Sequence, residues 1–250
     1  MTQRSAACLF ALNALFISSA NVDQISAQMT SATGARRITL GVIESADWRR
    51  GVSSTSSMRG TLFGIEEAQR TAAMFGWDLV VVRSPDSLNT SAAIQELTRG
   101  GPTALIGDLR GVRVVPNASG SSPLVFDIGR SAEARSDDGA DVGFHLLPPP
   151  DSVLAWHPSL VRYGAGQLNE RYRRRFGVEM DEPAWAAWIA VKILVDAVLK
   201  TGSSDPRALE LFLLDGASFD GHKGVPLFFD PRKRELVQPL FPPSGESEAR

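Results

Sequence analysis

Residues 77–82 read Trp-Asp-Leu-Val-Val-Val, and this apolar run decides the fold class. Three β-branched valines in succession, without polar alternation, are typical of a strand that is covered on both faces. Comparable apolar runs occur at residues 38–43, 103–106 and 123–126. Helical segments with Ser, Thr or Asn at their starts and Gly at their ends separate the first three runs, at residues 53–75 and 92–98. We therefore predict an α/β fold, a wound parallel sheet with right-handed crossovers that is flanked by helices.

The second half of the chain is predicted to be mainly helical, with segments at residues 160–175, 182–200 and 206–214. The middle segment is the most apolar, because only Lys192, Asp196 and Lys200 form a polar stripe along it. We expect it to be largely buried. Residues 224–229 and 236–240 read as a late hairpin, which predicts a small C-terminal β element.

A stripe of small side chains follows the first helical segment at intervals of four residues. It consists of Gly60, Gly64, Ala68 and Ala72. Small side chains permit a close approach, so we expect this helix to lie against the sheet through the stripe.

The N-terminus predicts export. Arg4 precedes an almost unbroken apolar stretch, residues 6–17, and small residues follow it, as in a signal peptide cleaved after Ala20 or Ala27. Cleavage would remove Cys8, the single cysteine, and leave a periplasmic protein that does not span the membrane. The expected organisation is a signal peptide at 1–27, a flexible leader at 28–36, one α/β domain at 37–216, a strand extension at 217–242 and a tail at 243–250.

Charge and motifs exclude several function classes. Lys and Arg total 26 against 28 Asp and Glu, a formal net charge of -2, which gives no reason to expect nucleic acid as a partner. Three consecutive arginines, Arg173 to Arg175, read as a solvated helix end rather than a phosphate site. The sequence contains no nucleophile elbow, phosphate loop or zinc-binding helix motif. We expect no catalytic residues, no metal and no cofactor, and we interpret His145, His157 and His222 as structural.

Polar side chains gather where the predicted strands end, which is where open α/β sheets bind ligands. The candidate ligand-binding residues are Glu44, Ser45, Ser84, Asp86, Asp108, Arg110 and Asp127. Strand ends and helix caps also favour Asp for structural reasons, so both interpretations stay open. Trp185 and Trp188 could form a stacking platform for a ligand, but their apolar helix favours a place in the core.

The strand 38–43, the helix from Arg59-Gly-Thr-Leu-Phe-Gly-Ile-Glu-Glu-Ala and the strand Ala104-Leu-Ile-Gly-Asp resemble the first lobe of type I periplasmic binding proteins. That family contains the branched-chain amino acid receptors. A narrower resemblance rests on Trp156-His-Pro, Tyr163-Gly-Ala-Gly-Gln-Leu-Asn and Asp220-Gly-His-Lys-Gly-Val. These motifs are similar to the PQQ-dependent catabolism-associated ABC transporter substrate-binding proteins.

The chain departs from the family in two respects. Asp151 is followed almost at once by Trp156-His-Pro, so most of the second lobe is expected to be deleted near 150–156. The third strand continues as Gly107-Asp-Leu-Arg110, without the paired serines with which the family holds an amino acid.

The resemblance implies a substrate-binding component of an ABC importer that binds a small polar solute and works with a permease. The alternative is a periplasmic accessory protein that has lost solute binding and contacts a dehydrogenase or cytochrome. A third hypothesis, an enzyme that uses Asp108, Asp127 and His145, rests only on their positions near strand ends.

Overall fold

The computed structural model describes residues 36–43, 52–84, 89–109, 122–130, 143–149 and 153–242. The chain divides into two compact units, residues 1–35 and 36–250, and the description below concerns the second. The expected signal peptide and the tail at 243–250 lie outside the described residues.

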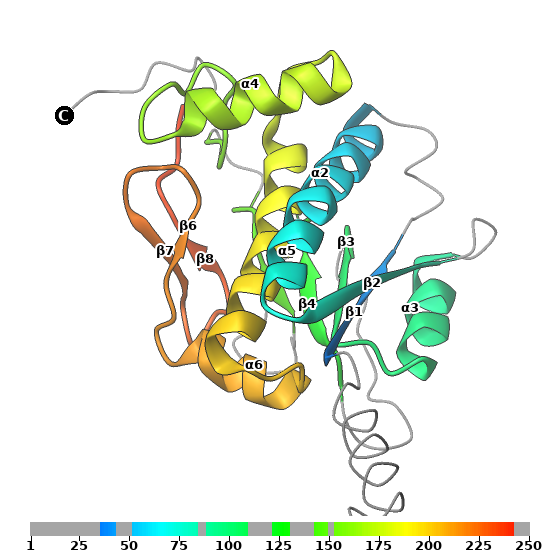
Figure 1. Ribbon diagram of the computed structural model, residues 1–250. Helices are drawn as coiled ribbons and strands as arrows, with labels where there is room; N and C mark the ends of the chain where they lie inside the picture. Colours follow the sequence, from blue (N-terminus) through cyan, green and yellow to red (C-terminus); the bar gives the residue numbers. More distant parts are fainter. Residues whose placement is uncertain are drawn as a thin grey trace, which may run out of the picture. The chain divides into compact units, whose positions relative to one another are not determined.

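A five-stranded parallel sheet forms the centre of this unit, as predicted (Figure 1). Its strands stand in the order β2-β1-β3-β4-β5. Their bounds are Arg36–Val42 for β1, Trp77–Arg83 for β2, Ala104–Gly107 for β3, Leu124–Asp127 for β4 and Phe144–His145 for β5. Ile38 of β1 lies opposite Leu79 of β2, and Phe126 of β4 lies opposite Phe144 of β5.

Helices cover both faces of the sheet. On one face lie α2 (Val52–Met74) and α5 (Glu182–Thr201), and α3 (Thr90–Arg99) covers the other. The pleat separates the two cores, because successive strand residues point to opposite faces. Ile106 and Phe126 belong to the large core, whereas Leu105 and Val125 join the smaller cluster under α3.

The stripe of small residues on α2 faces another helix, so the expectation that it lies against the sheet is wrong. A Cβ at Gly60 would stand 2.0 Å from the carbonyl oxygen of Ala184, and one at Gly64 would stand 3.0 Å from Cβ of Val191. Both contacts are with α5, which lies beside α2 (Figure 1). The stripe therefore sets the close approach of two helices from opposite halves of the chain.

The helix α5 is largely buried, as predicted. Asp181 caps it by accepting a hydrogen bond from Ala184 N, and Gly202 ends it at φ 67°. Trp185 and Trp188 are 0% and 1% exposed, so both belong to the core. The polar stripe is present, and Lys192 pairs with Asp196 at 3.1 Å.

The helix α4 (Ala165–Phe176) begins five residues later than predicted. Tyr163 and Gly164 have left-handed backbones, with φ of 55° and 88°, so residues 160–164 form turns instead of helix. At its other end Arg173 and Arg174 pair with Glu170, and Arg175 pairs with Glu66 of α2. The arginine run is therefore an exposed helix end in ion pairs with carboxylates.

A small antiparallel sheet completes the fold, with β6 (Phe219–Asp220), β7 (Pro226–Phe229) and β8 (Leu236–Val237) in that order after α6 (Pro206–Leu214). The predicted hairpin is confirmed, since Phe228 of β7 pairs with Val237 of β8. Phe229 turns inward, and its ring lies 4.8 Å from that of Phe144. Within the described residues, no helix is both long and apolar enough to cross a membrane.

Candidate functional site

The carboxyl ends of the parallel strands form the edge where we expected ligand-binding residues. Ser84, Asp108 and Asp127 are described there, at the ends of β2, β3 and β4. Glu44, Ser45, Asp86 and Arg110 lie outside the described residues.

Asp127 is a buried crosslink between strand ends. The residue is 3% exposed, and its Oδ1 accepts hydrogen bonds from Leu109 N at 3.0 Å and Gly129 N at 2.9 Å. Its Oδ2 lies 3.2 Å from Nδ1 of His145 on β5. One carboxylate thereby fastens the ends of β3, β4 and β5, and His145 has the structural environment that we expected.

Asp108 meets Asp127 around Gly129. A Cβ at Gly129 would stand 2.2 Å from Oδ1 of Asp108 and 3.1 Å from Oδ1 of Asp127, so the loop after β4 passes closely between the two carboxylates. Asp108 is partly exposed, in contrast to Asp127. Ser84 follows β2, which is separated from β3 by β1, and the residue is 3% exposed. Its N–H donates a hydrogen bond to Val42 O and so continues the β1–β2 ladder. The structure therefore brings together two of the three described candidates.

Arg130, three residues beyond β4, joins this edge to the start of α5. Its Nε and Nη2 bind the two carboxylate oxygens of Glu182 at 2.8 and 2.5 Å, a bidentate pair. Nη1 donates to Pro149 O at 3.1 Å and Nη2 to Val153 O at 2.8 Å. Arg130 therefore holds both ends of the segment that leads from residue 149 to residue 153.

Lys223 extends the network to the C-terminal sheet. Its Nζ donates to the carbonyl of Ala155 and, at 2.6 Å, to Oε1 of Gln238, and it lies 3.7 Å from the centre of the Trp185 ring. Burial lowers the pKa of this lysine well below its usual value, and the nearby Glu182 carboxylate opposes that shift in part.

We call Arg130, Glu182 and Lys223 with their backbone partners the crossing network, and no pattern in the sequence predicts it. Its members are scattered over almost 100 positions, and each looks like an ordinary surface charge in isolation. The motif from Asp220 to Val225 contains Lys223, but it indicates only a family resemblance and no contact with Arg130 or Glu182.

The strand-end carboxylates do not form a catalytic centre with His145. The His145 and Asp127 side chains are only 7% and 4% exposed, so the pair has almost no contact with solvent or substrate. A general base must reach the proton that it removes. The geometry therefore suits a crosslink, and Asp108 is the one of the three described strand-end candidates that is partly exposed.

Two hollows lie away from this edge, next to the β6–β7 loop. One, of about 410 Å³, is lined by Tyr163, Asp220 and neighbours on the hairpin. The other, of about 420 Å³, lies between α2, α4 and α5.

No protein-family model and no curated protein matches this chain. Solved structures match it in fold. The branched-chain amino acid transporter substrate-binding protein LivJ from Streptococcus pneumoniae, in complex with isoleucine, is 12% identical with a TM-score of 0.64, covering 86% of this chain and 98% of that one.

Two further structures agree. An ABC transporter substrate-binding protein from Desulfitobacterium hafniense, in complex with Leu, is 12% identical with a TM-score of 0.64, covering 82% of this chain and 96% of that one. A periplasmic binding protein from Burkholderia mallei is 13% identical with a TM-score of 0.56, covering 86% and 92%. The chain therefore has the α/β fold of the ABC transporter substrate-binding proteins. At these identities the likeness establishes the fold alone.

Proposed function

We propose that this protein is the periplasmic substrate-binding component of an ABC importer and that it is not an enzyme. The solute binds at the carboxyl edge of the parallel sheet, beside Asp108. The observation that carries this proposal is the pair of carboxylates around Gly129, of which Asp108 is the partly exposed one. Glu44, Ser45, Asp86 and Arg110 follow the same strand ends in the sequence and complete the proposed site.

The proposed solute is a small neutral metabolite of PQQ-dependent alcohol oxidation, an alcohol or an aldehyde, rather than a branched-chain amino acid. Two of the similar structures hold isoleucine and Leu. In this chain Asp108 and Leu109 stand where the resemblance implies a serine pair, and a carboxylate repels the carboxylate of an amino acid. A neutral or hydroxylated solute meets no such repulsion.

A calorimetric screen of alcohols, aldehydes, organic acids and amino acids tests this function. We expect binding of a hydroxylated solute that Asp108→Ala weakens at least tenfold, while it lowers the melting temperature less than Asp127→Ala does. The control, Asp127→Ala, should lower the melting temperature, because it removes the crosslink between strand ends. A lack of response to every solute at millimolar concentration would contradict the proposal.

A second candidate is an accessory protein without a transport role. Arg130 donates to the carbonyls of both Pro149 and Val153, on either side of the place where we expect a second lobe to be deleted. A single wall of a cleft buries less of a ligand than two walls do. Affinity capture distinguishes the candidates, since an importer component recovers a permease and an accessory protein recovers a dehydrogenase or cytochrome.

A further inference from the structure

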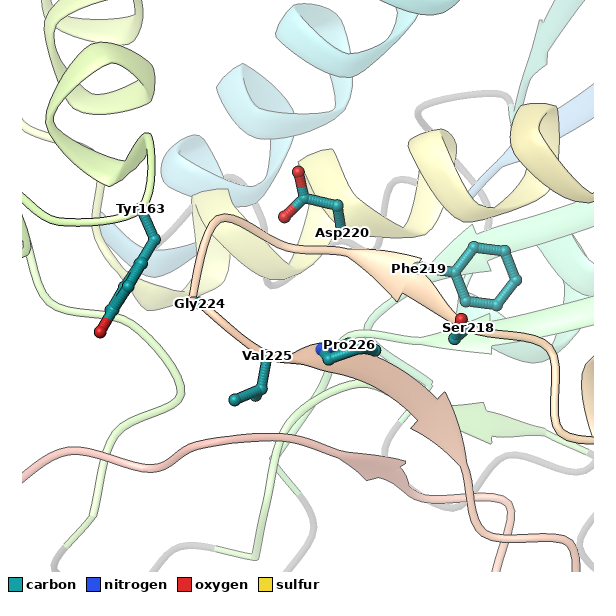
Figure 2. Close-up of a pocket in the computed structure, with 7 residues that line it drawn as sticks. All are labelled: Tyr163, Ser218, Phe219, Asp220, Gly224, Val225 and Pro226. Carbon is teal, nitrogen blue, oxygen red and sulfur yellow. The ribbon is translucent and has the colours of Figure 1, made fainter.

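A hollow of about 410 Å³ lies where the turn before α4 meets the β6–β7 hairpin. It is lined by Tyr163, Ser218, Phe219, Asp220, Gly224, Val225 and Pro226, and we call it the hairpin hollow. Figure 2 shows Tyr163 beside the hairpin tip at Gly224, and the Asp220 carboxylate projecting from β6. Its volume is within the range of small-molecule sites.

Two aromatic residues next to the hairpin hollow have strained backbones: Tyr163 lines it, and His222 lines the second hollow beside it. Tyr163 and His222 are two of three non-glycine residues with positive φ in the described part of the chain, at 55° and 59°. Glycines make room for both rings: a Cβ at Gly224 would stand 2.5 Å from the Tyr163 ring, and one at Gly164 would stand 2.8 Å from Nδ1 of His222. Strained residues concentrate at functional sites, because the surrounding structure must maintain them.

The Tyr163 ring remains available to a ligand. Its residue is 67% exposed although its backbone is fixed. Val225 is 48% exposed, and with Pro226 it gives the hairpin hollow an apolar wall. An exposed ring and an apolar wall suit an aliphatic chain.

Asp220 is the single charged residue among those that line the hairpin hollow. Its Oδ1 accepts a hydrogen bond from His222 N at 2.8 Å, which orients the carboxylate. The His222 ring lies 3.7 Å from Oδ2 and neutralises it only when protonated. The nearby Lys200 donates to Ser218 O at 3.0 Å and lies over the Phe219 ring.

The groove on the other side of Asp220 has a different charge balance. Asp220 also lines this groove of about 420 Å³, where Glu67 pairs with Arg171 at 2.8 Å and Lys192 pairs with Asp196 at 3.1 Å. Those four charges cancel in pairs. Asp220 supplies the negative charge at the junction of the two hollows, and the nearby cation outside these pairs is Lys200, whose ammonium group is already bound at Ser218 and Phe219.

We propose that the hairpin hollow binds a primary ammonium group on a short aliphatic chain. The ammonium group binds the oriented Asp220 carboxylate and lies near the face of the Tyr163 ring, and the chain lies along Val225 and Pro226. This site is distinct from the strand-end edge, and its occupation does not depend on the solute proposed there.

Titration of ¹⁵N-labelled protein with n-hexylammonium chloride, followed by NMR, tests the site. We expect the amide resonances of Asp220, Gly224 and Val225 to shift in a saturable manner at millimolar concentration. Sodium hexanoate and 1-hexanol have the same chain length but lack the cation, and they should leave these resonances unchanged. Equal shifts with hexanoate or hexanol, or shifts confined to the strand-end edge, would overturn the proposal.

Two variants separate the carboxylate from the ring. Asp220→Asn keeps the acceptor for His222 N but removes the charge, and should weaken hexylammonium binding about threefold to fivefold, as expected for an exposed ion pair. The matched control, Asp215→Asn, alters an exposed carboxylate at the end of α6 and should leave binding unchanged. Tyr163→Asn removes the ring with a residue that tolerates positive φ, and should weaken binding about fivefold without lowering the melting temperature. Unchanged affinity in Asp220→Asn contradicts the assignment.

Discussion

Glu182 and Arg130 form an ion pair that is largely shielded from water. The side chain of Glu182 is 8% exposed and that of Arg130 is 21% exposed. Removing one partner of such a pair leaves a charge without compensation, and this typically costs 3–5 kcal/mol. We expect Glu182→Gln to lower the free energy of unfolding by about 3 kcal/mol in urea titrations. The control is Glu170→Gln on α4, whose ion pairs with Arg173 and Arg174 are exposed and should contribute little. Equal effects of the two changes would show that the crossing network does not stabilise the fold.

The buried ammonium group of Lys223 makes stability depend on pH. Burial lowers the pKa of Lys223 in the folded state below its usual value of about 10.4. Between these two pKa values the unfolded chain binds more protons, so stability rises with pH by at most about 1.4 kcal/mol per unit. Lys223→Met should remove this rise. The measurement is the difference in unfolding free energy between the two proteins at pH 7, 8, 9 and 10, and parallel profiles would contradict the interpretation.

The residues at the strand ends show how far the sequence predicts a site. Asp108 and Asp127 were found because parallel strands end at one edge, which is a property of the fold class. The contacts of Asp127 with positions 109 and 145 could not be predicted, because the pairing of β3, β4 and β5 in the sheet brings these residues together. Sequence position locates the edge of the sheet, whereas the folded structure decides how exposed each side chain there is.

Among the elements, the α2–α5 pair is the most sensitive to a single added side chain. A Cβ at Gly60 would stand 2.0 Å from the Ala184 carbonyl oxygen, so any side chain there forces the two helices apart. We expect Gly60→Val to lower the free energy of unfolding by about 3 kcal/mol, at the upper end for overpacking. Ala73→Val, on the exposed side of the same helix, should cost less than about 1 kcal/mol, from helix propensity alone. Chemical denaturation of both variants measures the difference.

The elements themselves follow closely from local patterns. The strand at Trp77 and the helix after Asp181 were predicted because their signals, valine runs and a capped apolar helix, are local. Two expectations failed where the determinant was not local. The partner of the Gly60 stripe is a helix more than 100 positions away, and the start of α4 depends on a turn that Tyr163 occupies with a conformation rare outside glycine.

The molecule as a whole draws its main core from both halves of the chain, and the last strands are part of it. Leu227, Phe229 and Leu236 are buried in the same core as Ile38 of β1 and Trp185 of α5. The rings of Phe126, Phe144 and Phe229 lie within 6.5 Å of one another. The crossing network also ends here, through Lys223 and Gln238. The antiparallel sheet thus stabilises the central sheet that it contacts.

A chain that ends after Gly216 would therefore expose Phe126, Phe144 and Trp185, and would leave Arg130 and Glu182 without the Lys223 side of their network. We expect it to lack a cooperative unfolding transition and near-ultraviolet circular dichroism, because loss of several large buried side chains exceeds the 5–15 kcal/mol by which folded domains are stable. A chain that ends after Pro242 keeps every described contact and should unfold as the full protein does. Cooperative unfolding of the shorter chain would instead mean that residues 36–216 form a complete core, and that the C-terminal strands only cover it.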